Sequence, residues 1–292
     1  MDGIIVINKE KGFTSNDVVQ VLRGILRMKK IGHTGTLDPD AEGVLPVCLG
    51  KGTKLVNMLT DRDKEYIAEA RLGISTDTED MSGKVIKRFD IPEGKEPSEE
   101  ALKEALSSFI GGYDQIPPMY SAKKVNGRKL YDLAREGQVV ERKPCRVEIH
   151  DISLESYDFP VFRFSVRCGK GTYIRSLIRD TGEKLGTGAA MESLIRTEAS
   201  GFKLDEALTL KEVEELMARG EAESHIINPD RVFADLPSIT AEGRNEGFVR
   251  NGNPFSLPGI TDGDYRVYLP DGEFAAVYSF SRGKAGLKRM FL

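Results

Sequence analysis

Glycine and proline recur through the segment from Gly32 to Pro46, which contains the stretches GHTGTLDP (residues 32–39) and GVLP (residues 43–46). Because glycine loosens the backbone and proline lacks an N–H donor, this segment cannot continue as one helix or as a central strand. We therefore expect a shaped loop, in which the glycines let another molecule approach the backbone and Pro39 restricts Asp38. A carboxylate held in this way is a candidate nucleophile, base or ligand. The simpler alternative is a polar loop in which Asp38 caps a helix.

Length and composition predict a folded chain with one large and one small domain. The chain has 292 residues, 39% of them hydrophobic, and no low-complexity tract, so it can bury a substantial core. No apolar run reaches the roughly eighteen residues of a membrane span, and the short, acidic N-terminal segment is not typical of a signal peptide. Cys48, Cys145 and Cys168 are scattered and predict neither a disulfide framework nor a zinc site. We expect a cytoplasmic protein.

Charge is segregated along the chain although the formal net charge is only −4. Eight basic and three acidic residues lie between Ser121 and Arg146, whereas residues 205–223 contain seven acidic and two basic ones. A basic segment of this kind can bind phosphate while the acidic segment stays solvated. The charge alone is equally consistent with lysine and arginine side chains that only solvate a surface helix.

Hydrophobic periodicity predicts strands and helices through about the first 220 residues. Strand patterns cover residues 4–7, 64–73, 84–89, 145–154 and 161–168. Helices are expected after Thr14 or Ser15, after Ser98, over 129–136, over 174–185 and from the capping box at Thr209 to Gly220.

Two further segments stand apart from this regular pattern. Residues 111–146 are long, basic and interrupted by Pro117-Pro118, which is more typical of a binding or lid element than of a simple connection. Residues 237–292 contain short strands and frequent glycine, with a hairpin expected between 265–269 and 274–280. They predict a small β domain that packs on the main one.

The spacing of ligand-type residues does not favour a metal site. His33, His150 and His225 are the only histidines and form no short ligand motif. The sequence Gly-Lys-Gly-Thr at residues 169–172 lacks the spacer of a phosphate-binding P-loop. Tyr173 and Arg175 are nevertheless expected in the first turn of a helix, where backbone N–H groups and the helix dipole favour anions.

Several motifs together carry a resemblance to a known family. They are the two stretches in residues 32–46, KEY (64–66), IPPMYSAK (116–123), GRKLYDLAR (127–135) and GTYIR (171–175). In this order they resemble the TruB-type family of bacterial tRNA pseudouridine-55 synthases over about the first two hundred residues. One departure is Glu10 after Lys9, where the family usually has proline, which loosens that turn.

The resemblance implies an α+β fold with a mixed, mainly antiparallel sheet and flanking helices, the pseudouridine synthase fold. It also implies a catalytic domain over residues 1–232 with a basic RNA-binding insertion at about 111–146. The small C-terminal β domain, residues 237–292, is similar to the PUA-like RNA-binding domain that bacterial members append. The implied protein is a monomer that binds the T-stem-loop of tRNA, with no membrane partner.

The resemblance further implies isomerisation of the T-loop uridine at position 55 to pseudouridine, without cofactor or metal. Asp38 matches the nucleophile, Arg175 the residue that pairs with it and keeps it ionised, and Tyr66 the residue that stacks on uracil and assists removal of the C5 proton. Substrate contacts are implied for a second group of matching positions: His33, which holds the RNA loop with its bases turned out, Tyr173, Leu194, Lys9 and Lys64. Asp40 is expected to raise the pKa of Asp38 unless it points to solvent.

Two other readings of the sequence predict different functions. A non-catalytic RNA-binding protein could use the same basic segment and β domain. A glycoside or nucleoside hydrolase could use Asp38 with Asp40 or Glu42 as paired carboxylates.

Overall fold

The computed structural model describes residues 1–121, 123–125, 127–138 and 140–292. Ala122, Asn126 and Val139 lie outside the described residues, as do the side chains of Lys124 and Lys129. The IPPMYSAK and GRKLYDLAR motifs and the basic charges of the insertion are therefore covered only in part.

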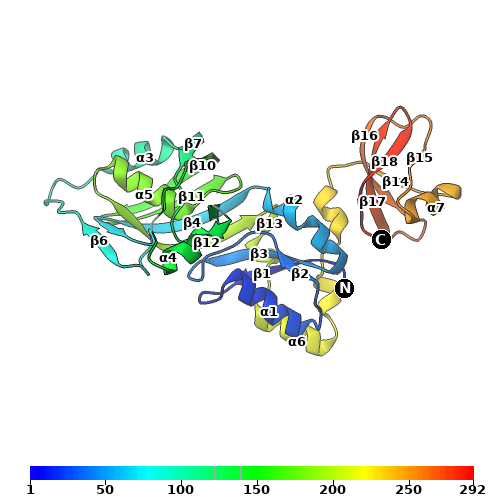
Figure 1. Cartoon of the computed structure of the whole chain (residues 1–292), viewed down its shortest axis with the longest axis horizontal. Coiled ribbons are helices and arrows are strands. Elements are labelled where there is room, and N and C mark those ends of the chain that lie inside the picture. Colours follow the sequence, from blue (N-terminus) through cyan, green and yellow to red (C-terminus); the bar gives the residue numbers. More distant parts are fainter. Residues whose placement is uncertain (122, 126, 139) are drawn as a thin grey trace.

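A mixed, mainly antiparallel sheet forms the first part of the described chain (Figure 1). Its strands are β1 (Gly3–Lys9), β2 (Ile31–His33), β3 (Glu42–Leu49), β4 (Lys64–Leu72), β7 (Gly111–Gln115), β10 (Cys145–Asp158), β11 (Val161–Cys168), β12 (Ala189–Ala199) and β13 (Phe202–Lys203). The main path runs β1-β3-β12-β4-β11-β10-β7, and only the short contact between β12 and β3 is parallel. This sheet confirms the expected α+β fold.

Helices cover both halves of the sheet. At one end α1 (Ser15–Ile25) and α6 (Leu210–Arg219) pack on β1 and β3, and at the other end α3 (Glu99–Ser107) and α5 (Ile174–Lys184) pack on β4, β10, β11 and β12. The expected caps are present: Thr14 and Thr209 form capping boxes, and Ser98 accepts from the Ala101 N–H. Short helical segments complete this part: η1 (Gly50–Leu55), α2 (Val56–Thr60), η2 (Leu204–Glu206), η3 (Ala222–His225) and η4 (Pro229–Phe233).

Strand β12 is central to the sheet, yet the sequence analysis did not predict it. Its alternation is interrupted by register shifts between Met191 and Ser193 and between Arg196 and Glu198. Because each irregularity displaces the period-two pattern by one residue, the strand has no continuous alternation to detect.

The expected loop from Gly32 to Pro46 was also too long, because its second half is strand β3. Pro46 fits into this strand because its carbonyl accepts from the Thr34 N–H at 3.1 Å and so faces away from β1. The nitrogen of a strand residue faces the same side as its carbonyl, so the nitrogen of Pro46 also faces away from β1. The missing N–H therefore removes no bond from the β1–β3 ladder. The loop proper spans residues 34–41.

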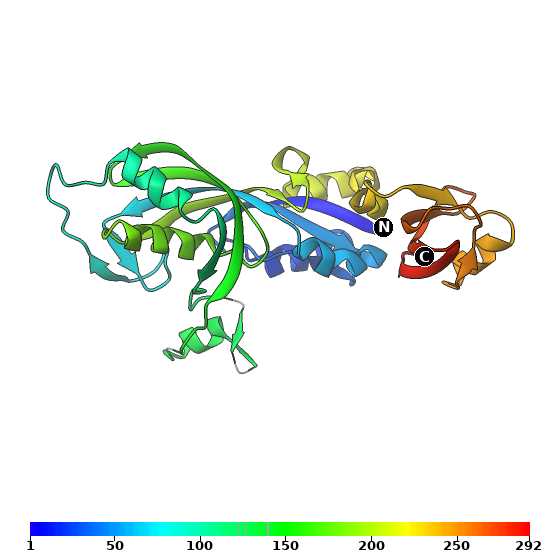
Figure 2. The same ribbon diagram turned by 90° about the horizontal axis from the view of Figure 1, so that it is seen from above.

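Two small hairpins extend from the body. One pairs β5 (Ile74–Thr76) with β6 (Val85–Arg88), and the other pairs β8 (Lys124–Val125) with β9 (Arg128–Lys129) before helix α4 (Leu130–Arg135). Figure 2 shows the β8–α4 segment projecting from the rest of the chain. Residues 111–115 were expected in an irregular stretch but form the sheet strand β7, so the projecting insertion begins after Gln115.

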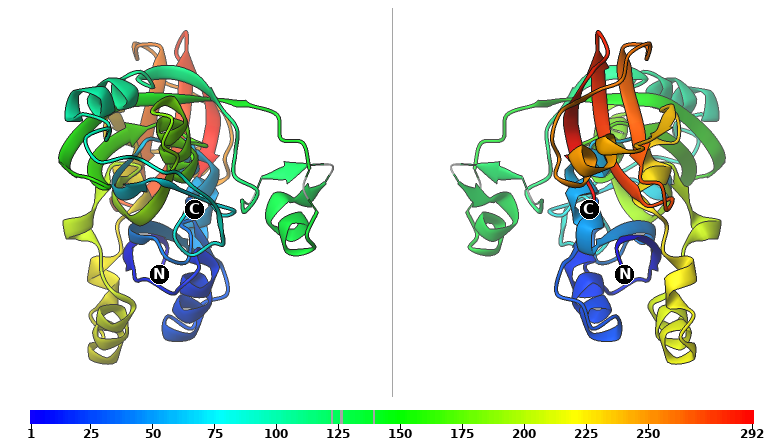
Figure 3. Two further views of the ribbon diagram at one scale, coloured as in Figure 1. Left: turned by 90° about the vertical axis from the view of Figure 1, so that its left-hand side faces the viewer. Right: turned by 90° about the vertical axis from the view of Figure 1, so that its right-hand side faces the viewer.

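The C-terminal residues form a second sheet, nearest the viewer in the right panel of Figure 3. Its order is β14 (Ser238–Thr240), β16 (Gly263–Tyr268), β17 (Phe274–Ser281), β18 (Lys284–Met290) and β15 (Phe255–Ser256). The expected hairpin is therefore present, together with a short helix α7 (Arg244–Arg250) that the glycines at 243 and 247 concealed. Phe274, Val277 and Phe291 pack against Ile4 and other residues of the first part.

No helix among the residues described above combines the length and the apolar character needed to cross a membrane.

Candidate active site

The loop that carries Asp38 is anchored on both sides of that residue. The Leu37 N–H donates to Ser15 Oγ at 2.8 Å, at the start of α1. The carbonyl of Pro39 accepts from the Gly12 N–H at 2.8 Å and from Lys9 Nζ at 3.1 Å. These bonds fix the backbone before and after Asp38, so the carboxylate projects from a rigid turn.

Arg175, in the first turn of α5, binds both oxygens of the Asp38 carboxylate. Its Nε lies 2.8 Å from Oδ2 and its Nη2 donates to Oδ1 at 3.0 Å. The guanidinium also donates to the carbonyls of Thr78 and Tyr120, each at 2.9 Å. Because four bonds hold this buried guanidinium, the bidentate fork orients the carboxylate as well as neutralising it.

The environment nevertheless raises the pKa of Asp38 above its ordinary value. Burial is the main cause, and the Arg175 charge opposes it. Asp80 adds to the increase, and its carboxylate lies 3.8 Å from Arg175 Nη1. The neighbouring acid is therefore Asp80, which the sequence analysis did not single out, whereas the side chain of Asp40 is exposed.

Asp38, Arg175 and Leu194 line two adjoining cavities. The first, of about 300 Å³, is also lined by Tyr66 and Tyr173. The second, of about 440 Å³, is lined in addition by Asp80, Tyr120 and Tyr131, among others. The fold thus brings Asp38 and Arg175, which are 137 positions apart in sequence, to one hollow with four of the other predicted site residues.

Tyr66 on β4 is paired with Arg196 on the adjacent β12. Burial raises the pKa of the Tyr66 phenol, and the Arg196 charge beside it works in the opposite direction. Arg196 is 1% exposed, and it donates to the carbonyls of Val44 at 2.7 Å and Gly35 at 3.2 Å. Its guanidinium therefore joins the base of the Asp38 loop to the phenol.

Arg196 was missed by the sequence analysis because its strand was missed. The available signal was a single cation after the apolar pair at 194–195. Gly43 lets strand β3 lie close to the backbone of Arg196. A Cβ at position 43, where φ is +102°, would lie 2.3 Å from the Arg196 carbonyl oxygen. Only glycine lets the two backbones approach this closely.

Lys9 and Lys64 occupy buried positions rather than exposed ones. Lys9 has no exposed surface, and its ammonium bonds the carbonyls of Glu10 and Pro39, so it contacts the Asp38 loop. Lys64 donates to the carbonyls of Thr60 and Arg62 and lines the 300 Å³ cavity. Burial lowers the pKa of each amine to about 8. The predicted substrate contact is therefore geometrically open to Lys64, whereas Lys9 is placed to support the loop.

The remaining predicted residues are Tyr173, Leu194 and His33. Tyr173 precedes α5, and its N–H donates to Gln115 Oε1 at 2.8 Å, so this backbone donor is not free for an anion as expected. Leu194 is 6% exposed and contributes an apolar wall. His33 lies at the end of β2, where burial lowers its pKa, and it does not line either cavity.

Within the described ranges, no group of three or more His, Cys, Asp or Glu side chains is arranged to hold a metal ion. The chemistry that the site offers is that of a positioned carboxylate, a guanidinium, a buried phenol and an apolar wall.

The mixed sheet, with helices on both of its halves, is the fold of the pseudouridine synthase class. Residues 23–174 match the family model described as TruB family pseudouridylate synthase (N terminal domain), and residues 175–234 match the tRNA pseudouridylate synthase B C-terminal domain. The chain belongs to the TruB family of pseudouridylate synthases and is an isomerase.

Relatives and solved structures extend this similarity over nearly the whole chain. The tRNA pseudouridine synthase B of Bacillus velezensis is 42% identical, covering 98% of this chain and 96% of the relative. That of Lachnoclostridium phytofermentans is 48% identical, covering 97% of each chain. A structure described as a Cbf5-Nop10-Gar1 complex aligns with a TM-score of 0.73 at 26% identity, over 99% of this chain and 85% of the other.

Proposed function

We propose that this enzyme converts the T-loop uridine at position 55 of tRNA to pseudouridine, with Asp38 as the nucleophile and without metal or cofactor. The observation that carries the proposal is the bidentate Asp38–Arg175 pair in a cavity shared with Tyr66. The names of the relatives, tRNA pseudouridine synthase B, support tRNA as the substrate.

The residues of the site divide the isomerisation between them. Asp38 acts on the target nucleotide while its C1′–N1 bond breaks, the uracil turns, and a C1′–C5 bond forms as the C5 proton leaves. The reaction needs no oxidant or reductant, because all atoms are retained apart from the exchange of that proton with solvent. Arg175 keeps the carboxylate ionised and aimed, and Tyr66 stacks on the uracil and assists proton removal.

Arg196 gives the Tyr66 phenol a partner for this task. A buried phenol is a poor proton acceptor because burial favours its neutral form. The adjacent guanidinium favours the ionised form and so opposes that effect. We infer that Arg196 supports the phenol rather than contacting the RNA, since it has almost no exposed surface.

A uridine stacked in an RNA hairpin cannot reach a cavity lined by Asp38 and Leu194, so the nucleotide must be turned out of its stack. We infer that His33 helps to hold the opened loop from outside the cavities. The basic insertion supplies phosphate contacts, and residues 237–292 form a second RNA-binding domain beside the catalytic residues 1–232. The enzyme acts as a monomer in the cytoplasm.

The position of the modification can be tested on a T-stem-loop transcript. Carbodiimide treatment followed by primer extension marks pseudouridine at single-nucleotide resolution. The proposal predicts a single stop, one nucleotide 3′ of position 55, no stop on a transcript with cytidine at this position, and no free uracil. A stop elsewhere would contradict the assigned site, and release of free uracil would indicate the hydrolase instead.

A further inference from the structure

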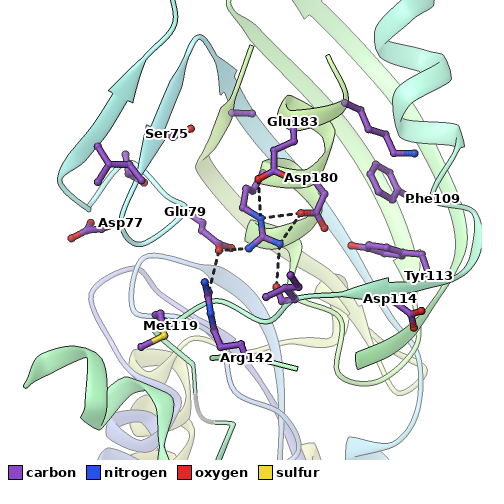
Figure 4. A pocket seen from close by; sticks show the side chains of 16 residues that line it. Ser75, Asp77, Glu79, Phe109, Tyr113, Asp114, Met119, Arg142, Asp180 and Glu183 are labelled. Atoms are coloured by element: carbon purple, nitrogen blue, oxygen red, sulfur yellow. Dashed lines mark hydrogen bonds and ion pairs between the residues drawn. The ribbon is translucent and has the colours of Figure 1, made fainter. Parts of the chain in front are cut away.

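A third cavity, of about 760 Å³, lies behind the loop 77–80 that lines the active site (Figure 4). Successive residues of this loop face opposite ways. Thr78 and Asp80 line the 440 Å³ active-site cavity, whereas Asp77 and Glu79 line the larger one. The loop therefore separates the two cavities. Glu79 lies between Thr78 and Asp80, and both of these neighbours contact Arg175.

Glu79 is held in an unusual position by three side chains. Its Oε2 accepts from Ser176 Oγ at 2.7 Å, and its Oε1 pairs with Arg179 and lies 3.9 Å from Arg142 Nη1. The backbone of Glu79 has φ +65°, a left-handed conformation that is uncommon for glutamate. Its side chain is only 9% exposed. Backbone strain and burial of this charge both have a cost, which the bonds to Glu79 offset.

The same arginines hold the stem of the basic insertion, defined here as Ile116 and Pro117 on the outgoing side and Arg142 on the returning side. Arg142 Nη1 donates to the Pro117 carbonyl at 3.0 Å, and Arg179 Nη2 donates to the Ile116 carbonyl at 3.1 Å. Figure 4 shows Arg142 pointing toward Glu79 across this region. Both sides of the stem are therefore connected, through these two arginines, to the Glu79 carboxylate.

Helix α5 connects this carboxylate to the reacting group. Ser176 and Arg179 follow Arg175 in the same helix, and Arg175 itself donates to the Thr78 carbonyl next to Glu79. Arg175 also donates to the carbonyl of Tyr120, which follows the outgoing side of the stem. Arg175 is therefore bonded both to Asp38 and to the segments that adjoin the stem, so the position of the stem bears on the orientation of the Asp38–Arg175 pair.

We propose that Glu79 is a positioning residue that clamps the stem of the RNA-binding insertion to α5. The clamp consists of Glu79, Ser176, Arg179 and Arg142. It holds the insertion in the orientation that receives RNA, and the inference rests on the proposed function of the insertion. Glu79 does not touch the substrate in this account, because it faces the cavity behind the active-site wall.

The charge balance predicts what the loss of Glu79 does. Without the carboxylate, Arg142 and Arg179 lose the charge that they share, and Arg179 keeps its pairs with Asp180 and Glu183 on α5. The stem then separates from α5, so the insertion must be ordered at the moment of binding, at a cost in affinity. We expect Glu79→Gln to weaken RNA binding about tenfold while the rate of conversion of bound RNA changes less than about threefold.

The experiment compares three single variants and one double variant of the full chain on a T-stem-loop RNA. Glu79→Gln removes the shared charge. Arg142→Gln removes the contribution of the stem to the clamp, and because the Arg142 side chain is 25% exposed, this change leaves the core intact. Glu183→Gln is the matched control, because Glu183 lies 3.9 Å from the same Arg179 but is 69% exposed, so that its charge is largely solvated. Dissociation constants and single-turnover rates at saturating RNA are measured for each variant and for the double variant Glu79→Gln/Arg142→Gln.

The clamp predicts weaker RNA binding by Glu79→Gln and by Arg142→Gln. The double variant should bind RNA no more weakly than whichever single variant binds it less tightly. Glu183→Gln should bind RNA as the wild type does. Losses that multiply in the double variant would overturn the inference, because Arg142 would then contact RNA independently of Glu79. Unchanged binding by Glu79→Gln with only a lower melting temperature would also overturn it, as a purely structural role. Either result, obtained with an active wild-type enzyme, leaves the proposed function standing; an inactive wild type would refute that function itself.

Discussion

Arg175 binds both carboxylate oxygens of Asp38 from the first turn of α5, with its Nε 2.8 Å from Oδ2 and its Nη2 3.0 Å from Oδ1. The guanidinium is almost fully buried, whereas the carboxylate is 37% exposed toward the cavities. One partner is therefore fixed in the protein, and the other is open to the cavities. In the proposed mechanism Arg175 is the group that orients and Asp38 is the group that reacts.

Replacement of Arg175 by lysine keeps a positive charge but removes the planar fork. An ammonium cannot bind both oxygens of Asp38 and the carbonyls of Thr78 and Tyr120 in the same geometry. We expect Arg175→Lys to lower the single-turnover rate by about 10²-fold, the effect of a small misplacement of a reacting group. A rate within about threefold of wild type at saturating RNA would show that charge alone suffices.

Replacement of Tyr66 by phenylalanine separates stacking from proton transfer. The ring remains to stack on the base, but the hydroxyl beside Arg196 is lost. Since acid–base assistance is worth roughly 10²- to 10⁴-fold, we expect Tyr66→Phe to lower the rate by about 10²-fold with little change in RNA affinity. Rapid-quench kinetics and filter binding measure the two effects. Loss of affinity with an unchanged rate would assign Tyr66 to stacking only.

The dependence of the rate on pH reports the ionisation of Asp38. Because the pKa of Asp38 is raised by burial and by Asp80, and the carboxylate reacts in its ionised form, the rate rises with pH through this raised pKa. Asp80→Asn removes one cause of the increase. It should move the acidic limb of the single-turnover profile to lower pH, whatever its effect on the plateau. A limb that moves to higher pH would contradict the role of Asp80 in this electrostatic environment.

The same shift in the pKa of Asp38 predicts a cost in stability. The pKa in the folded protein lies above the unfolded value, so the folded state binds the proton more tightly. The corresponding stabilisation is present below the unfolded pKa and is lost as pH rises through the folded pKa. Asparagine at this position avoids the ionisation, so Asp38→Asn should melt at a higher temperature than wild type at pH 7. The difference should shrink in acid, and a lower melting temperature at pH 7 would contradict this prediction.

The sequence was most informative where a local rule determines structure. Thr14, Ser98 and Thr209 predicted three helix starts, because a capping side chain acts on backbone donors only a few residues away. The alternation from Lys64 to Leu72 predicted β4 and its buried face for the same reason.

Structure that depends on distant partners was not visible in the same way. Strand β12 was missed because its irregularities have meaning only against β4. Pro46 was assigned to a loop because proline normally interrupts a strand. The bond from Thr34 that sets which way Pro46 faces is visible only in the structure. Asp80 and Arg196 entered the site only through tertiary contacts, with Arg175 and with the Asp38 loop.

In the proposed mechanism the Asp38 carboxylate carries out the isomerisation. A T-stem-loop transcript labelled with tritium at C5 of uridine releases the label to water when pseudouridine forms, so tritium release measures the reaction directly. The account predicts release by wild type and a loss of about 10⁴-fold or more with Asp38→Asn, at wild-type RNA affinity. Equal release of tritium by the two proteins would contradict the account.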